Sequence, residues 1–95
     1  GWRQDGNSWF FKIRSGLRCE DGQEITASSF RSSLARSISR LSLEEAKETP
    51  FGDLVGLNSF LSGGSATALG IHVTNDELEI RFNKPVGKSV LEYLA

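Results

Sequence analysis

The stretch LGIHVTNDELEIRF, residues 69–82, predicts the fold more clearly than any other part of the chain. Leu69, Ile71 and Val73 alternate with small or polar residues, and the alternation resumes after Asn75-Asp76 at 78, 80 and 82. A period of two is typical of a strand with one buried face. Asn and Asp accept the backbone angles of a tight turn. The stretch therefore predicts a β-hairpin with one apolar face.

A second hairpin is predicted at the start of the chain. Trp2–Gln4 reads as a short strand, the turn falls at 5–7, and 8–14 returns as a strand in which Trp9, Phe11 and Ile13 alternate with other residues. Phe10 interrupts the polar side of that return strand. We expect Phe10 to mark an apolar patch that another part of a larger protein covers.

Helical periodicity fills the middle of the chain. Thr26 is a candidate N-cap, and the apolar residues that follow it, spaced three or four apart, share one helix face. They are Phe30, Leu34, Ile38 and Leu41. Ser42 and Glu45 have the spacing of a capping box for a short helical turn that Pro50 brings to an end.

Two more helical segments are predicted. Asp53 is expected to cap a helix whose apolar face includes Leu54, Leu57 and Leu61, with the glycines at 63 and 64 stopping it. A final amphipathic segment begins at 87.

The order of these elements is hairpin, helices, hairpin, helix. Grouped strands and helices favour an α+β fold over an alternating α/β fold. We expect a small, mostly antiparallel sheet of two hairpins with two or three helices packed on it. The two hairpins should merge into one layer with Trp9 and Ile80 on the same side. A chain of 95 residues has the length of a single domain, 1–95.

Composition excludes several classes of partner. The formal net charge is −1, so bulk charge does not attract nucleic acid, and no nucleic-acid partner is expected. One cysteine forms no internal disulfide. No apolar run approaches the ~20 residues of a membrane-spanning helix.

Candidate chemical groups are few. His72 is the only histidine, and neither a cysteine nor a second ligand lies at metal-binding or catalytic spacing from it. Cys19 has only Arg18 to lower its pKa, so it is expected to be an inert, partly buried side chain. Glu20 and Asp21 are adjacent, but an acid–base pair needs carboxyl groups that face each other. We therefore expect no catalytic residue, no metal ligand, no cofactor and no enzymatic activity.

The arginines and glycines also favour structural roles. Arg31, Arg36 and Arg40 are expected on a solvated helix face, their field cancelled by the glutamates that follow. Arg36 is expected to bridge to loop carbonyls or to a carboxylate, with Asp21 as one candidate. Ser33 has no base near it in sequence, and the glycines of 62–67 are followed by no lysine, which argues against a phosphate-binding loop.

A set of residues in order and spacing resembles the bacterial solute-binding proteins of the peptide, dipeptide and nickel class. The matching residues are Trp2, Asp5, Gly6, Trp9, Phe11, Ile13, Arg14, Gly16, Leu17, Asp21, Gly22, Ile25, Thr26, Ala27, Phe30, Ser33 and Arg36. The helix, glycines, hairpin and final helix of 57–95 also resemble the family. The chain departs from the family pattern at three positions, with Cys19 and Arg31 where aromatic residues are usual and Ser29 where an acidic residue is usual.

The resemblance implies that the chain is an excised subdomain, the smaller part of the first lobe of a two-lobed protein. Such proteins capture a peptide-like or other small solute outside the cytoplasm, in the periplasm or on the extracellular face, for ATP-driven (ABC-type) import. The implied partners are the remainder of the two-lobed protein, the solute, which other segments mainly bind, and the ABC permease. No ligand-contact residue is assigned within the chain. The alternative is a solute-binding-like sensor domain of a transcription regulator.

Overall fold

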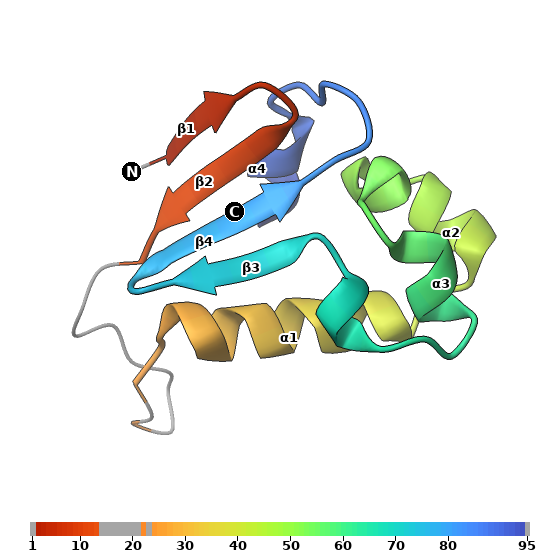
Figure 1. The fold of residues 1–95 in the computed structure, drawn as a ribbon, viewed down its shortest axis with the longest axis horizontal. Coiled ribbons are helices and arrows are strands. Elements are labelled where there is room, and N and C mark those ends of the chain that lie inside the picture. Colours follow the sequence, from red (N-terminus) through yellow and green to blue (C-terminus); the bar gives the residue numbers. More distant parts are fainter. Residues whose placement is uncertain (1, 14–21, 23, 95) are drawn as a thin grey trace.

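The computed structural model describes residues 2–13, 22 and 24–94. Four strands form one antiparallel sheet in the order β1-β2-β4-β3 (Figure 1). Their bounds are β1 Trp2–Asp5, β2 Ser8–Lys12, β3 Ile71–Thr74 and β4 Glu77–Arg81. Helices join the strands and cover one face of the sheet, so the fold is α+β, as predicted.

The two hairpins merge in the middle of the sheet. β2 pairs with β4, and Trp9 lies opposite Ile80, which in turn lies opposite Ile71 on β3. These three side chains are 1 %, 0 % and 0 % exposed. The prediction that Trp9 and Ile80 share one side of a common layer is confirmed. Asn75 makes the β3–β4 turn with a φ of 57°, in the left-handed region that Asn tolerates.

α1 (Ala27–Ser39) packs against β3 and β4. The Thr26 side chain accepts a hydrogen bond from the Ser29 backbone N–H, and the Ser29 hydroxyl accepts one from the Thr26 N–H, so the predicted N-cap is a full capping box. Leu34 and Ile38 are buried on the predicted apolar face, whereas Phe30 and Leu41 are half-buried. Figure 1 shows α1 running beside β3 along one edge of the sheet.

A group of short helices forms one end of the molecule. They are α2 (Leu43–Lys47), the 3₁₀ turn η1 (Pro50–Asp53), α3 (Leu57–Leu61) and the 3₁₀ turn η2 (Ala66–Ala68). The capping box of Ser42 and Glu45 at the start of α2 is confirmed. Pro50 follows the end of α2, as predicted, and itself opens η1.

The segment between η1 and α3 differs from the sequence prediction. Asp53 belongs to η1 and does not cap the next helix, which begins only at Leu57. Leu54 is instead buried in an isolated bridge with Phe82, and the Val55 N–H donates to the Arg81 carbonyl at 3.0 Å. The sheet thus takes up the residues expected to form the first helical turn. At Gly56 the φ is 79°, and a Cβ would lie 2.3 Å from the Ala68 carbonyl oxygen.

The C-terminal segment closes the core under the first hairpin. The Val86 carbonyl accepts from Trp9 Nε1 at 3.0 Å and from Gln4 Nε2 at 3.1 Å. α4 (Ser89–Leu94) follows, with Val90 fully buried. The ring of Tyr93 meets that of Phe51 edge-on at 5.0 Å. These contacts join both ends of the described chain to one core.

Candidate functional site

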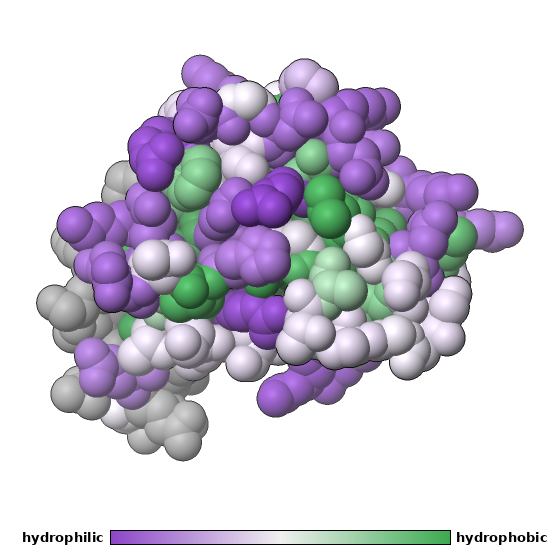
Figure 2. Space-filling view, viewed as in Figure 1, coloured by the Kyte–Doolittle hydropathy of each residue, from purple (hydrophilic) through white to green (hydrophobic). Residues whose placement is uncertain are grey.

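The sheet has one face away from the core, which we call the open face. Strand alternation places on it the side chains that lie between the core residues. They are Arg3, Asp5, Ser8, Phe10, Lys12, His72, Thr74, Glu77, Glu79 and Arg81. Figure 2 shows this side of the molecule as mostly hydrophilic, with scattered apolar side chains.

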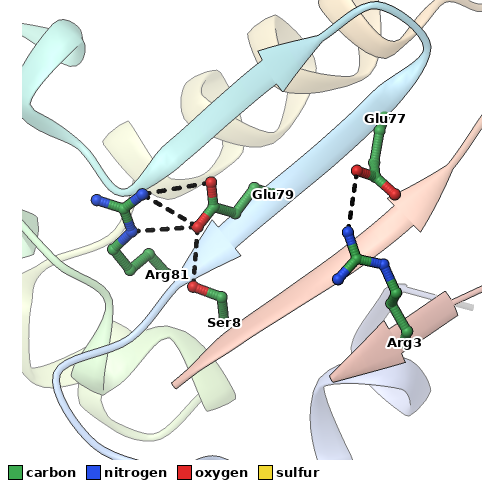
Figure 3. A network of polar contacts seen from close by, with 5 residues as sticks. All are labelled: Arg3, Ser8, Glu77, Glu79 and Arg81. Atoms are coloured by element: carbon green, nitrogen blue, oxygen red, sulfur yellow. Dashed lines mark hydrogen bonds and ion pairs between the residues drawn. The ribbon is translucent and has the colours of Figure 1, made fainter. Parts of the chain in front are cut away.

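One cluster on the open face is centred on Glu79 (Figure 3). Its carboxylate accepts from Ser8 Oγ at 2.9 Å and from Arg81 Nε at 3.1 Å, each on Oε2, and from Arg81 Nη2 at 3.3 Å on Oε1. Ser8 is buried. Because the Glu79 carboxylate that accepts from Ser8 is also paired with Arg81, and Ser8 is itself buried, this contact reads as a structural hydrogen bond and not as an activated nucleophile.

A second cluster surrounds Arg3. Its guanidinium lies 3.9 Å from the centre of the Phe10 ring, and its Nη2 lies 3.3 Å from Glu77 Oε1. Phe10 is therefore half-buried under a side chain of this chain, which accounts for an apolar residue on the polar side of β2. A shallow hollow of about 250 Å³ lies here, lined by Trp2, Arg3, Phe10, Lys12 and Glu77. The pairing leaves neither Arg3 nor Glu77 as an isolated charge.

The residues singled out from the sequence do not converge. His72, on β3, lies opposite Glu79 of β4; its side chain is half-buried and makes no hydrogen bond within the described residues. Ser33 is exposed on α1. Cys19, Glu20 and Asp21 lie outside the described residues. In 2–13, 22 and 24–94 no group of three His, Cys, Asp or Glu side chains is placed to hold a metal ion.

Arg31 is the residue that sequence reasoning placed wrongly. Its side chain does not lie on a solvated face: Nε donates to the Ile71 carbonyl at 2.7 Å and Nη2 to the Ala66 carbonyl at 2.9 Å. One arginine therefore joins α1 to β3 and η2. The Arg36 side chain, where such a bridge was expected, is exposed and makes no hydrogen bond to a described residue, and Asp21, its candidate partner, lies outside the described residues. The unusual Arg31 in place of the family's aromatic residue was the signal in the sequence.

The described residues contain no buried polar side chain aimed at a missing partner. Every buried side-chain nitrogen or oxygen among them has a hydrogen-bond partner. None of the helices described here combines the length and the hydropathy that crossing a bilayer needs. The sheet is therefore packed against helices on one face, and on its open face the carboxylates of Glu77 and Glu79 are paired with arginines.

The arrangement of nearly the whole chain matches a known structure. The murein tripeptide binding protein MppA of Escherichia coli superposes on 95 % of the chain with a TM-score of 0.74 and 25 % sequence identity. The fold is that of one segment of the bacterial peptide-binding proteins. The resemblance read from the sequence is thus confirmed by the structure.

Two further structures share the peptide-binding-protein fold. A periplasmic oligopeptide-binding protein of Borrelia burgdorferi covers 90 % of the chain with a TM-score of 0.67 and 24 % identity. OppA of Haemophilus influenzae, in complex with the peptide RPPGFSPFR, covers 95 % with a TM-score of 0.70 and 19 % identity. At these identities the likeness shows the fold alone.

The chain spans 18 % of the length of each of these three proteins. No protein-family model matches the chain, and no curated protein matches it in sequence. The Escherichia coli and Borrelia burgdorferi proteins are named as binding proteins, and the Haemophilus influenzae protein is in complex with RPPGFSPFR. The chain therefore corresponds to a small part of their architecture.

Proposed function

We propose that the chain is a scaffold subdomain of an extracytoplasmic solute-binding protein that serves ABC-type import of a peptide-like or other small solute. The observation that carries the proposal is the superposition of nearly the whole chain on one segment of MppA. The subdomain stiffens one lobe, while other segments of the two-lobed protein make most contacts with the solute. It is not an enzyme.

The contacts within the chain support a bracing role. The carboxylates of Glu77 and Glu79 are paired with arginines of the same sheet, so neither is left to bind a solute. In a two-lobed binding protein the solute stabilises the closed state by contacts that span both lobes. A subdomain whose buried polar side chains, among the described residues, all have partners contributes rigidity to that closure.

Calorimetry tests this role directly. The 95-residue chain, titrated with short peptides of varied charge and length, is expected to give no saturable heat. The two-lobed parent protein, titrated in parallel, is expected to bind at least one of them. Micromolar binding to the 95-residue chain alone would contradict the scaffold role and place a solute site within it.

The proposal also implies where the parent protein acts and which protein receives its solute. The parent protein would act in the periplasm or on the extracellular face and would deliver its solute to an ABC permease. The alternative, a sensor domain of a transcription regulator, stays a prediction from the sequence resemblance. The start of the parent gene separates the two, because a transport protein needs an export signal and a regulator needs a DNA-binding domain.

A further inference from the structure

The outer edge of β1 carries backbone groups that have no partner among residues 2–13, 22 and 24–94. In an antiparallel pair, successive residues direct their N–H and C=O groups alternately to one neighbour and to the other. The Phe82 N–H donates to the Asn7 carbonyl and the Ile13 N–H to the Asp76 carbonyl, so odd-numbered residues of β2 face β4 and even-numbered ones face β1. Arg3 and Asp5 are opposite Phe10 and Ser8, and their backbone groups therefore face β2. Those of Trp2 and Gln4 face outward.

The opposite edge of the sheet is partly covered. On β3 the outward residues are Ile71 and Val73, because the Arg81 N–H donates to the Gly70 carbonyl. The Ile71 carbonyl accepts from Arg31 Nε at 2.7 Å, and the Ile71 N–H donates to the Leu69 carbonyl at 2.8 Å. α1 runs along this edge (Figure 1). Such covering is how proteins prevent unwanted strand pairing.

β1 has no such cover among the described residues. All four of its residues are exposed, and Trp2 remains 49 % exposed. Charges on an edge strand usually discourage pairing, because like charges meet when two copies approach. On β1, however, the two charges are opposite in sign and lie symmetrically about Gln4, as Arg3 and Asp5. An edge of this kind is complementary to itself.

We infer that β1 is a pairing surface for a second copy of this chain, with the two β1 strands antiparallel about a twofold axis at Gln4. In that register Gln4 faces Gln4 of the second copy, and their outward backbone groups exchange two hydrogen bonds. Arg3 lies opposite Asp5 of the second copy on both sides of the axis, all on the open face. A register centred on Arg3 or on Asp5 would place like charges opposite each other. Charge thus favours the register centred on Gln4 over the two neighbouring ones, and the product is a continuous eight-stranded sheet.

The Arg3–Glu77 contact is compatible with this pairing. Glu77 lies on β4, toward the middle of the sheet, whereas the second copy would approach from the outer side of β1. A guanidinium has five N–H donors and can serve carboxylates on both sides. The Gln4 side chain donates to the Val86 carbonyl on the core side of the sheet. It therefore does not occupy the outward backbone N–H of Gln4, which would bind the second strand.

Sedimentation equilibrium over a concentration series tests the inference. The wild-type chain is expected to associate to a dimer. Each of the single variants R3D and D5R places like charges opposite each other in the dimer and is expected to weaken it by about tenfold or more. Mixing R3D with D5R restores complementary edges, so a heterodimer is expected where neither variant associates alone. The double variant R3D/D5R is expected to dimerise again.

Two further variants guard against indirect effects. Q4P removes the outward N–H of Gln4 without removing a bond to β2, and it is expected to abolish the dimer while far-UV circular dichroism stays unchanged. K12D reverses a charge on the same face but inside the sheet, and it is expected to dimerise as the wild type does. A wild-type chain that stays monomeric throughout, a mixture of R3D and D5R that does not associate, or a Q4P variant that associates normally would overturn the inference. If R3D fails to fold, D5R and Q4P alone still decide it.

Discussion

Arg31 links three elements through one side chain, and its contribution to stability is expected to be large for a residue on a helix surface. Its two donors satisfy the Ile71 and Ala66 carbonyls, one on β3 and one on η2. A hydrogen bond from a charged donor contributes up to about 1.5–3 kcal/mol to the free energy of unfolding. Removing the two bonds of Arg31 also leaves partly buried carbonyls without a partner. The same side chain also closes an edge strand, so its loss would affect both stability and solubility.

R31A is therefore expected to lower the free energy of unfolding by about 2 kcal/mol. The matched control is R36A on the same helix, which removes an exposed side chain that makes no hydrogen bond to a described residue and is expected to stay within about 0.5 kcal/mol of the wild type. Urea denaturation followed by tryptophan fluorescence measures both. Equal effects of the two variants would show that the bonds of Arg31 contribute nothing to stability.

At the scale of the element, α2 is a five-residue helix whose start depends on the capping box of Ser42 and Glu45. The Ser42 backbone N–H, and then its hydroxyl, hold the pKa of the Glu45 carboxyl below its usual value of 4.5. A depressed folded-state pKa adds stability at neutral pH, and this increment is lost as pH falls through the folded pKa. Acid should thus loosen this helix start.

E45Q is expected to keep the geometry of the box without its charge. The wild type should be the more stable of the two at pH 7, and the difference in Tm should shrink as pH falls below the usual glutamate value of 4.5. The control is E44Q, which neutralises the neighbouring carboxylate outside the box. Thermal melts from neutral to acidic pH provide the measurement. A difference between wild type and E45Q that does not change with pH would exclude this role of the charge.

The elements differ in how far the sequence determines them. Both hairpins, the N-cap of Thr26 and the capping box of Ser42 could be predicted because their signals are local: alternation about a turn, and a hydroxyl three residues before its partner. The region from Asp53 to Leu57 could not be predicted, because Leu54 and Val55 pair with residues nearly thirty positions away. Arg31 was misjudged for the same reason, because its acceptors lie 40 and 35 residues along the chain. Side chains on the open face could be placed from alternation, but their pairing could not.

For the whole molecule, the fold depends on one seam, the pairing of β2 with β4 that joins the first hairpin to the last. Ile80 lies at its centre, fully buried between Trp9 and Ile71. Truncating such a side chain leaves a cavity and costs about 2–5 kcal/mol, which is a large share of the 5–15 kcal/mol that stabilises a small domain.

I80A is therefore expected to destabilise both hairpins together, with coincident urea transitions by tryptophan fluorescence and by far-UV circular dichroism. I25A removes the same atoms from a half-buried position outside the core cluster and is expected to cost about 1 kcal/mol. Two separate transitions in I80A would mean that the hairpins fold independently and that the helices, not the seam, hold them in one layer.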